Sequence, residues 1–176
     1  MKEVVSTDRE RNSKCIVARR DAVERQARIL VVDDIDTNRE IVEAYLSSGG
    51  YSVDAVGSAA EAIRILESES RDLVLMDIQM PVMDGVAATR CIRSLPNAIK
   101  DIPIIAMTAN VLPEHVRSYL EAGMNGHVGK PIERVKLCDS IERCLSGAVR
   151  DEGDARPIWL DATKSGNDAS TSTADR

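Results

Sequence analysis

Five polar residues stand where apolar runs end in this sequence, and together they offer three carboxylates, one hydroxyl and one ammonium: Asp33, Asp34, Asp77, Thr108 and Lys130. Carboxylates held together repel, by about 4 kcal/mol for two charges about 4 Å apart at an effective dielectric of about 20. A divalent cation offsets that repulsion, and ligands that are all oxygen favour Mg2+. These residue types therefore predict a hard-metal site rather than a structural salt bridge.

Each of these residues has a simpler explanation when it is taken alone. An Asp after a strand is often a helix cap or a turn residue, and a Lys in a loop is usually solvated. The functional interpretation depends on the five residues meeting in space. That requirement leads to the elements that carry them.

An alternation of apolar runs and helical segments places all five residues at one edge of a sheet. The predicted strands are 29–32, 52–56, 73–76, 102–107 and 126–129. The predicted helices are 37–48, a segment capped by Ser58, 85–95, 113–123 and 132–145. This alternation predicts an α/β fold with a doubly wound, five-stranded parallel sheet and helices on both faces. In such sheets, sites lie beyond the carboxyl ends of the strands.

Composition and charge exclude several classes of function. The chain has three Tyr, one Trp and no Phe, which argues against folds that stack nucleic-acid bases on aromatic side chains. Residues 29–146 hold eleven Lys and Arg against eighteen Asp and Glu, a net charge of −7 that disfavours nucleic-acid binding. The four cysteines form no C-x-x-C pair, so zinc is not expected. With neither a membrane-length apolar run nor a signal peptide, we expect a cytoplasmic chain without membrane contact.

The two ends of the chain differ from its middle in composition. Residues 1–26 mix charged residues with short apolar fragments, and we expect a flexible extension there. Residues 147–176 are rich in Ser, Thr, Ala and Asp, and we expect a disordered tail. The predicted domain therefore spans residues 27–146.

Four motifs in this middle segment resemble those of a known family. They are Val31-Val32-Asp33-Asp34, then residues 76–85 (MDIQMPVMDG), then Ile105-Ala106-Met107-Thr108-Ala109, and last Lys130-Pro131. In this order and at these separations they resemble the receiver domains of two-component response regulators. The resemblance covers roughly residues 27–146 and implies a flavodoxin-like receiver fold with strand order 2-1-3-4-5.

The resemblance implies a role for each residue at the predicted edge. Asp77 would be the phosphoacceptor, Lys130 would bind the phosphoryl group, and Thr108 would donate a hydrogen bond to it. The family's Mg2+ would be held by three carboxylates and one backbone carbonyl, those of Asp33, Asp34, Asp77 and Gln79. The bond between Lys130 and Pro131 resembles the family's cis peptide.

Two positions distinguish this sequence within the family pattern. The residue three before Lys130 is usually Tyr or Phe and acts as a rotameric switch together with Thr108, but here it is His127. Gln79 and Asn110 stand where side chains line the path of attacking water, and both are neutral amides. We therefore predict a phosphoryl lifetime of minutes or longer.

The predicted function is that of a phosphoacceptor receiver in a histidine–aspartate phosphorelay. The donor would be a sensor histidine kinase or a histidine phosphotransfer protein. The output would be switched protein contacts through the fourth helix of the domain, its fifth strand and its last helix, with Arg117, Tyr119 and Leu120 as candidate contacts. We expect no enzyme activity beyond the receiver's own phosphorylation and dephosphorylation. The receiver would stand alone or belong to a hybrid histidine kinase.

Two other functions were weighed. A phosphorylation-independent adaptor would keep the fold without using the pocket, although all five pocket residues are present. A phosphohydrolase of the haloacid-dehalogenase type is suggested by Asp34-Ile35-Asp36, which resembles its D-x-D motif. No acidic pair follows Lys130 as that family requires, and the hydrolase leaves Asp77 unexplained.

Overall fold

The computed structural model, which describes residues 26–146, contains one parallel sheet in the order β2-β1-β3-β4-β5. Its strands are β1 (Arg28–Val32), β2 (Ser52–Val56), β3 (Leu73–Asp77), β4 (Ile104–Thr108) and β5 (Gly126–Gly129). Each neighbouring pair is parallel, so all five carboxyl ends lie at the same edge. The predicted fold class and strand order are confirmed.

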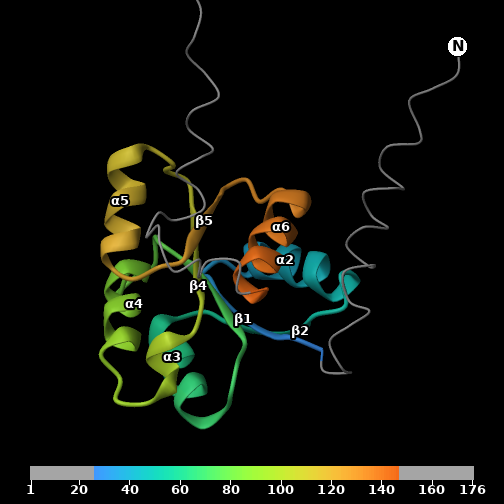
Figure 1. Cartoon of the computed structure of the whole chain (residues 1–176). Coiled ribbons are helices and arrows are strands. Elements are labelled where there is room, and N and C mark those ends of the chain that lie inside the picture. The colour runs from blue at the N-terminus through green and yellow to red at the C-terminus, as the bar shows by residue number, and fades with distance from the viewer. Residues whose placement is uncertain (1–25, 147–176) are drawn as a thin grey trace, which may run out of the picture.

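Helices cover both faces of the sheet (Figure 1). They are α2 (Asp36–Ser48), α3 (Ala59–Ser68), α4 (Gly85–Arg93), α5 (Pro113–Glu121) and α6 (Arg134–Leu145), with a short 3-10 helix η1 (Ala98–Asp101). One buried cluster joins the sheet to α2 and α6, and a second joins it to α3, α4 and α5. The molecule therefore has three layers, as right-handed crossovers require.

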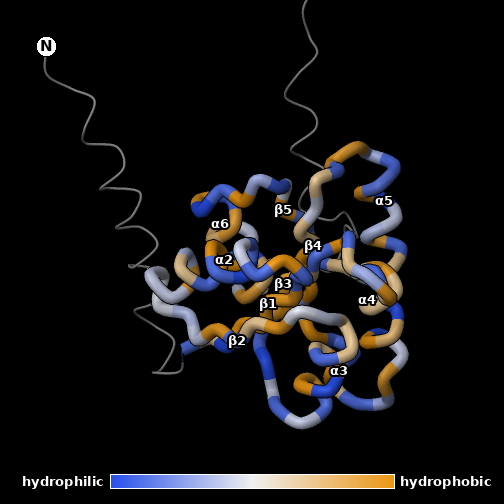
Figure 2. The backbone as a smooth tube through the Cα atoms, turned by 180° about the vertical axis from the view of Figure 1, so that it is seen from behind, coloured by the Kyte–Doolittle hydropathy of each residue, from blue (hydrophilic) through white to orange (hydrophobic). Residues whose placement is uncertain are grey.

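The strands are apolar on both faces because both faces are covered. In β1, Ile29 and Val31 belong to the cluster under α2 and α6, whereas Leu30 and Val32 belong to the other cluster. All four are fully buried. Figure 2 shows the result, with the hydrophobic tube of β1 and β3 at the centre of the domain. An unbroken apolar run is typical of such a central parallel strand.

Several element boundaries differ from the predicted ones. The fourth strand begins at Ile104 rather than at residue 102, because Ile102 N–H closes the turn of η1 on Ile99 and Pro103 has no N–H to offer a strand. Helix α4 ends at Arg93 and α6 begins at Arg134. The predicted cap of α3 is confirmed, since Ser58 Oγ accepts a hydrogen bond from Glu61 N–H at 3.3 Å.

The predicted extension over residues 1–26 and the predicted tail over 147–176 lie outside the described residues, apart from Gln26. Within the part of the chain that the structure describes, no helix is long and apolar enough to cross a membrane. All the predicted site residues, from Asp33 to Lys130, lie within the described residues 26–146.

Candidate functional site

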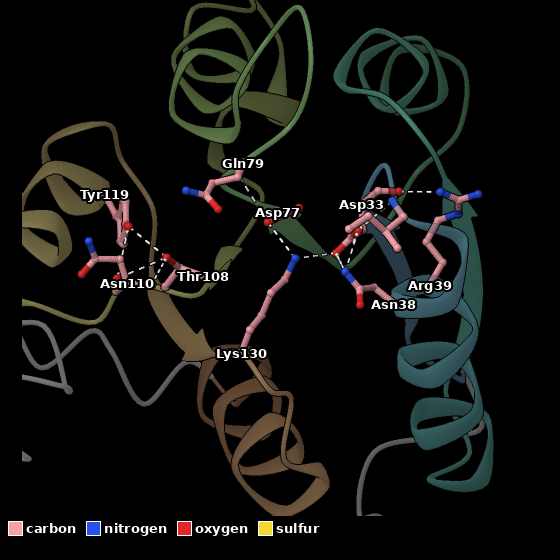
Figure 3. A network of polar contacts seen from close by, with 10 residues as sticks. Asp33, Asn38, Arg39, Asp77, Gln79, Thr108, Asn110, Tyr119 and Lys130 are labelled. Atoms are coloured by element: carbon pink, nitrogen blue, oxygen red, sulfur yellow. Dashed lines mark hydrogen bonds and ion pairs between the residues drawn. The ribbon is translucent and has the colours of Figure 1, made fainter.

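Three of the predicted residues meet at the carboxyl edge of the sheet. Asp33 follows β1, Asp77 is the last residue of β3, and Lys130 follows β5. Lys130 Nζ lies 2.8 Å from Asp33 Oδ2 and 2.9 Å from Asp77 Oδ1 (Figure 3). We call these three residues the acceptor cluster. The ammonium joins two carboxylates that would otherwise repel each other.

The two carboxylates of the acceptor cluster are almost completely buried, whereas Lys130 is partly exposed. Asp33 and Asp77 expose 0% and 2% of their surface, so neither carboxylate has bulk water to stabilise its charge. Burial is the largest influence on the pKa of Asp77 and raises it above its ordinary value, and the charge of Asp33 acts in the same direction. Hydrogen bonding and charge from Lys130 lower the pKa of Asp77 without cancelling that rise.

Lys130 is held in its charged form by the same contacts. Burial alone would lower the pKa of Lys130, but hydrogen bonds and charge from Asp33 and Asp77 together raise it above its ordinary value. The ammonium is therefore a fixed positive charge beside Asp77. The peptide bond between Lys130 and Pro131 is cis, as the family resemblance implied.

Three residues that the sequence analysis missed orient Asp33. Asn38 Nδ2 donates to both carboxylate oxygens of Asp33 at 3.1 Å, and Ile35 N–H donates to Oδ1 at 2.9 Å. Arg39 Nη1 donates to the backbone carbonyl of Asp33 at 2.6 Å and also pairs with Asp36. These contacts hold Asp33 from the first turn of α2. Asp36 itself is exposed and lies outside the acceptor cluster.

The acidic residues fit a hard cation. Oxygen atoms of Asp33, Asp34 and Asp77 all lie within 4.8 Å of one another. Asp34 Oδ1 is buried and has no hydrogen-bond partner in the described part of the chain, so its lone pairs are available to a metal ion. Gln79 N–H donates to Asp77 Oδ1 at 3.3 Å. The Gln79 carbonyl as a fourth ligand stays a prediction.

A turn packs closely against the backbone of Asp77. Gly85 N–H donates to the Ile78 carbonyl at 3.0 Å, and Asp84 caps α4 by accepting from Ala87 N–H at 2.7 Å. A Cβ atom on Gly85 would clash with the carbonyl oxygen of Asp77 and lie 3.0 Å from the side chain of Met76. Only glycine allows this approach, so Gly85 supports the position of Asp77.

Thr108 lies at the same edge, and its backbone carbonyl accepts a hydrogen bond from Lys130 N–H at 2.7 Å, but among the described residues its side chain forms no hydrogen bond with the acceptor cluster. Its Oγ1 lies 3.0 Å from the hydroxyl of Tyr119 and accepts from Asn110 N–H at 3.0 Å (Figure 3). We call Thr108, Asn110 and Tyr119 the hydroxyl cluster. The prediction that Tyr119 is a surface contact is wrong, because the residue is only 4% exposed. Arg117 is exposed and Leu120 is partly buried.

The predicted switch residue His127 lies in the middle of β5. It is opposite Ala106 in the sheet register and therefore on the same face as Thr108, two residues further along β4. The side chain is partly buried, and burial lowers the pKa of His127 below its ordinary value. At neutral pH the imidazole is therefore uncharged. Its role as a switch stays a prediction.

The geometry agrees with comparisons to known proteins. A family model for the response regulator receiver domain matches residues 29–142, which is well over half of the chain. The chain therefore belongs to the receiver domain family of two-component systems, and its function is that of a receiver in phosphorelay signalling. This confirms the resemblance found in the sequence.

Its relatives include hybrid sensor kinases and a transcription factor. Sensor protein GacS of Pseudomonas syringae pv. syringae is 36% identical over 134 residues, which cover 75% of this chain and 15% of that protein. Transcription factor SKN7 of Chaetomium thermophilum is 34% identical over 157 residues, which cover 85% of this chain and 20% of that protein. The chain thus spans a fifth or less of the length of these curated relatives.

Solved receiver structures share the fold. The receiver domain of the sensor histidine kinase PA1611 from Pseudomonas aeruginosa, crystallised with magnesium coordinated in its active-site cleft, aligns with a TM-score of 0.64 and 39% identity. That alignment covers 69% of this chain and 99% of the other. A putative response regulator from Chloroflexus aurantiacus aligns with a TM-score of 0.66 and 30% identity over 69% of this chain and 99% of the other.

Proposed function

We propose that Asp77 accepts a phosphoryl group from a phosphohistidine on a partner protein. The observation that carries this proposal is the acceptor cluster, in which a buried carboxylate at a strand end is joined to an ammonium and lies beside two further carboxylates. A buried salt bridge of this kind contributes little to stability, because desolvation offsets its Coulombic gain. The cluster is better explained by function.

In the proposed reaction, an Asp77 carboxylate oxygen attacks phosphorus on the phosphohistidine. The new P–O bond forms as the P–N bond breaks, and the electron pair of that bond stays on the imidazole nitrogen, which then takes up a proton. The Lys130 ammonium then moves from the carboxylates to the phosphoryl oxygens, where the negative charge now lies. Catalysis therefore consists mainly of positioning and charge stabilisation.

The residues that would hold Mg2+ are Asp33, Asp34, Asp77 and the backbone carbonyl of Gln79. When bound there, the ion supplies positive charge that neutralises the carboxylates and the incoming phosphoryl oxygens. Asn38 and Ile35 hold the Asp33 carboxylate in place beside this site, because both donate hydrogen bonds to it. Arg39 fixes the backbone from which that carboxylate projects.

The proposed donor is a sensor histidine kinase or a histidine phosphotransfer protein, and the proposed compartment is the cytoplasm. Kinship with hybrid sensor kinases supports this choice of donor. We also propose that Thr108 and His127 form the switch and that α5, β5 and α6 form the face that contacts a downstream protein. Nucleic acid and membrane are not expected partners, and no enzyme activity beyond autophosphorylation and dephosphorylation is proposed.

Gln79 and Asn110 support a slow loss of the phosphoryl group. The Gln79 side chain is exposed beside Asp77, and the Asn110 side chain accepts a hydrogen bond from Leu112 N–H at 3.2 Å. Neither amide is a general base for water. The proposed lifetime is therefore minutes or longer, and a time course of dephosphorylation measures it.

The test is incubation with acetyl phosphate and Mg2+ followed by intact-mass measurement. The wild type gains one adduct of about 80 Da, the mass of a single phosphoryl group, and Asp77→Asn gains none. Asp139→Asn, which changes an exposed carboxylate on α6, keeps the adduct. A wild type that stays unmodified contradicts the proposal, and an adduct on Asp77→Asn places the acceptor elsewhere.

A further inference from the structure

The phenol of Tyr119 is a buried polar group that the proposed reaction does not use. Tyr119 lies on α5 and packs in the cluster beneath α3, α4 and α5, together with residues such as Met80 and Met124. Its hydroxyl oxygen lies 3.0 Å from Thr108 Oγ1 and 3.3 Å from the Asn110 carbonyl oxygen. A tyrosine in a core normally needs such partners for its hydroxyl.

The Thr108 hydroxyl is fully occupied in this arrangement. It accepts from Asn110 N–H at 3.0 Å, lies 3.2 Å from the Asn110 carbonyl, and shares a hydrogen bond with Tyr119. Among the described residues, all the hydrogen bonds of Thr108 Oγ1 are within the hydroxyl cluster, and none is to Asp77 or Lys130. Thr108 must therefore give up contacts of this cluster before it can donate to a phosphoryl group on Asp77.

We propose that Tyr119 is a positioning residue that holds Thr108 in its resting orientation and so opposes the response to phosphorylation. This inference rests on the proposed function, since it assumes that Asp77 carries the phosphoryl group. The hydroxyl that restrains Thr108 comes from helix α5, whereas the aromatic position on β5 is occupied by His127. Helix α5 therefore has a direct hydrogen-bonded connection to the residue that responds.

The proposal also gives a route by which the response leaves the site. When Thr108 turns toward the phosphoryl group, the Tyr119 hydroxyl keeps only its contact with the Asn110 carbonyl. Loss of one of the two hydrogen bonds of a buried hydroxyl is unfavourable, and this favours a readjustment of Tyr119 and the turn of α5 around it. The change at Asp77 would thus reach α5 through one side chain.

The test measures the affinity for beryllofluoride, an analogue of the bound phosphoryl group, by calorimetry in saturating Mg2+. Tyr119→Phe keeps the ring and removes the hydroxyl, so its contact with the Asn110 carbonyl is lost in both states, whereas the neutral hydrogen bond to Thr108 is lost only from the resting state. We expect beryllofluoride to bind about two- to tenfold more tightly than to the wild type. Tyr51→Phe, at a tyrosine that is 7% exposed on the other face of the sheet, leaves the affinity unchanged.

A double-mutant cycle shows whether the effect passes through Thr108. In a Thr108→Val background, Tyr119→Phe no longer tightens beryllofluoride binding. Equal tightening in both backgrounds, or no tightening in the wild-type background, overturns the inference. If the wild type itself does not bind beryllofluoride, the proposed function fails and the inference fails with it.

The same cycle in urea unfolding, without beryllofluoride, tests the resting contact alone. Coupling between Thr108→Val and Tyr119→Phe supports the restraint, because substitutions at residues in contact are non-additive whereas those at independent sites add. Additive losses of stability overturn the inference even if Asp77 is phosphorylated. The two failures are therefore distinguishable.

Discussion

The acceptor cluster and the hydroxyl cluster lie at the same edge of the sheet but are built differently. The acceptor cluster is ionic and joins three strands, with Asp33 and Lys130 97 positions apart in the chain. The hydroxyl cluster is uncharged and local, formed by residues 108–119 at the junction of β4 and α5. The backbone N–H of Lys130 donates to the backbone carbonyl of Thr108 at 2.7 Å, but among the described residues no hydrogen bond joins the Thr108 side chain to the acceptor cluster.

This difference suggests a division of labour within the site. In the proposed reaction, the acceptor cluster already has a carboxylate nucleophile and an ammonium side by side, so little reorganisation is required there. The hydroxyl cluster satisfies its own hydrogen bonds and must rearrange to respond. Broken ion pairs in a buried site also cost more than broken neutral hydrogen bonds. Substitutions should therefore affect stability most in the acceptor cluster.

The largest expected effect is that of Lys130→Met. Removing the ammonium leaves two buried carboxylates without a cation and should lower the free energy of unfolding at pH 7 by about 3 kcal/mol. Lys136→Met is the control, because Lys136 pairs with Glu133 on the exposed surface of α6 and should lose only a small fraction of that amount. Urea unfolding without Mg2+ measures both.

The same variant has a defined pH dependence. Without Lys130, the pKa of Asp77 rises further, because burial and Asp33 raise it and the cation that lowers it is gone. A carboxyl whose folded pKa exceeds its unfolded pKa gains stability as the pH falls. The difference in the free energy of unfolding between Lys130→Met and wild type should therefore become smaller as the pH falls from 7 toward 3.8, the ordinary pKa of Asp. A constant or widening gap would show that the loss is not ionic.

The second largest expected effect on stability is that of Gly85→Ala. The added methyl group clashes with the carbonyl of Asp77, and overpacking of this kind costs about 1–3 kcal/mol. It should also slow phosphoryl uptake, because it displaces the backbone of the acceptor residue. Gly126→Ala is the matched control, since a Cβ there meets nothing within 4 Å. Equal uptake rates for the two variants would show that the acceptor cluster tolerates displacement.

The smallest effect is that of Asp34→Asn on the affinity for Mg2+. Loss of one charged ligand should weaken binding by on the order of tenfold or more. Calorimetric titration with Mg2+ measures this, with Asp139→Asn as the control for a lost surface charge. Unchanged affinity would remove Asp34 from the ligand set and leave its buried Oδ1 atom without an explanation.

The sequence was sufficient to predict the sheet and the acceptor cluster. Asp77 and Lys130 follow apolar runs, and parallel strands bring such ends to one edge whatever the intervening loops do. Boundaries were less accurate where local hydrogen bonds decide them, as after η1, where Ile102 N–H donates to the Ile99 carbonyl instead of joining the strand. The roles of Asn38 and Arg39 could not be predicted, because nothing in the sequence shows which polar side chains of a first helical turn point at a neighbouring strand.

The orientation of the Thr108 side chain shows a different limit of prediction from sequence. Its place at the edge was predictable, but its rotamer depends on a tyrosine from another element. One signal was available: Val116, Tyr119 and Ala122 recur at intervals of three, and all three are buried. That spacing indicates an inward face of α5. The close approach of Gly85 to Asp77 had no such signal, since a glycine after an aspartate is typical of any turn.

The separation of Asp33 from Lys130 along the chain has a kinetic consequence. A contact between residues this far apart closes a long loop, and such contacts form late in folding because chain entropy opposes them. The acceptor cluster needs β1, β3 and β5 in register, so a chain still emerging from the ribosome, or one trapped half-folded, holds no complete cluster. Phosphoryl uptake would then occur only in chains that have finished folding.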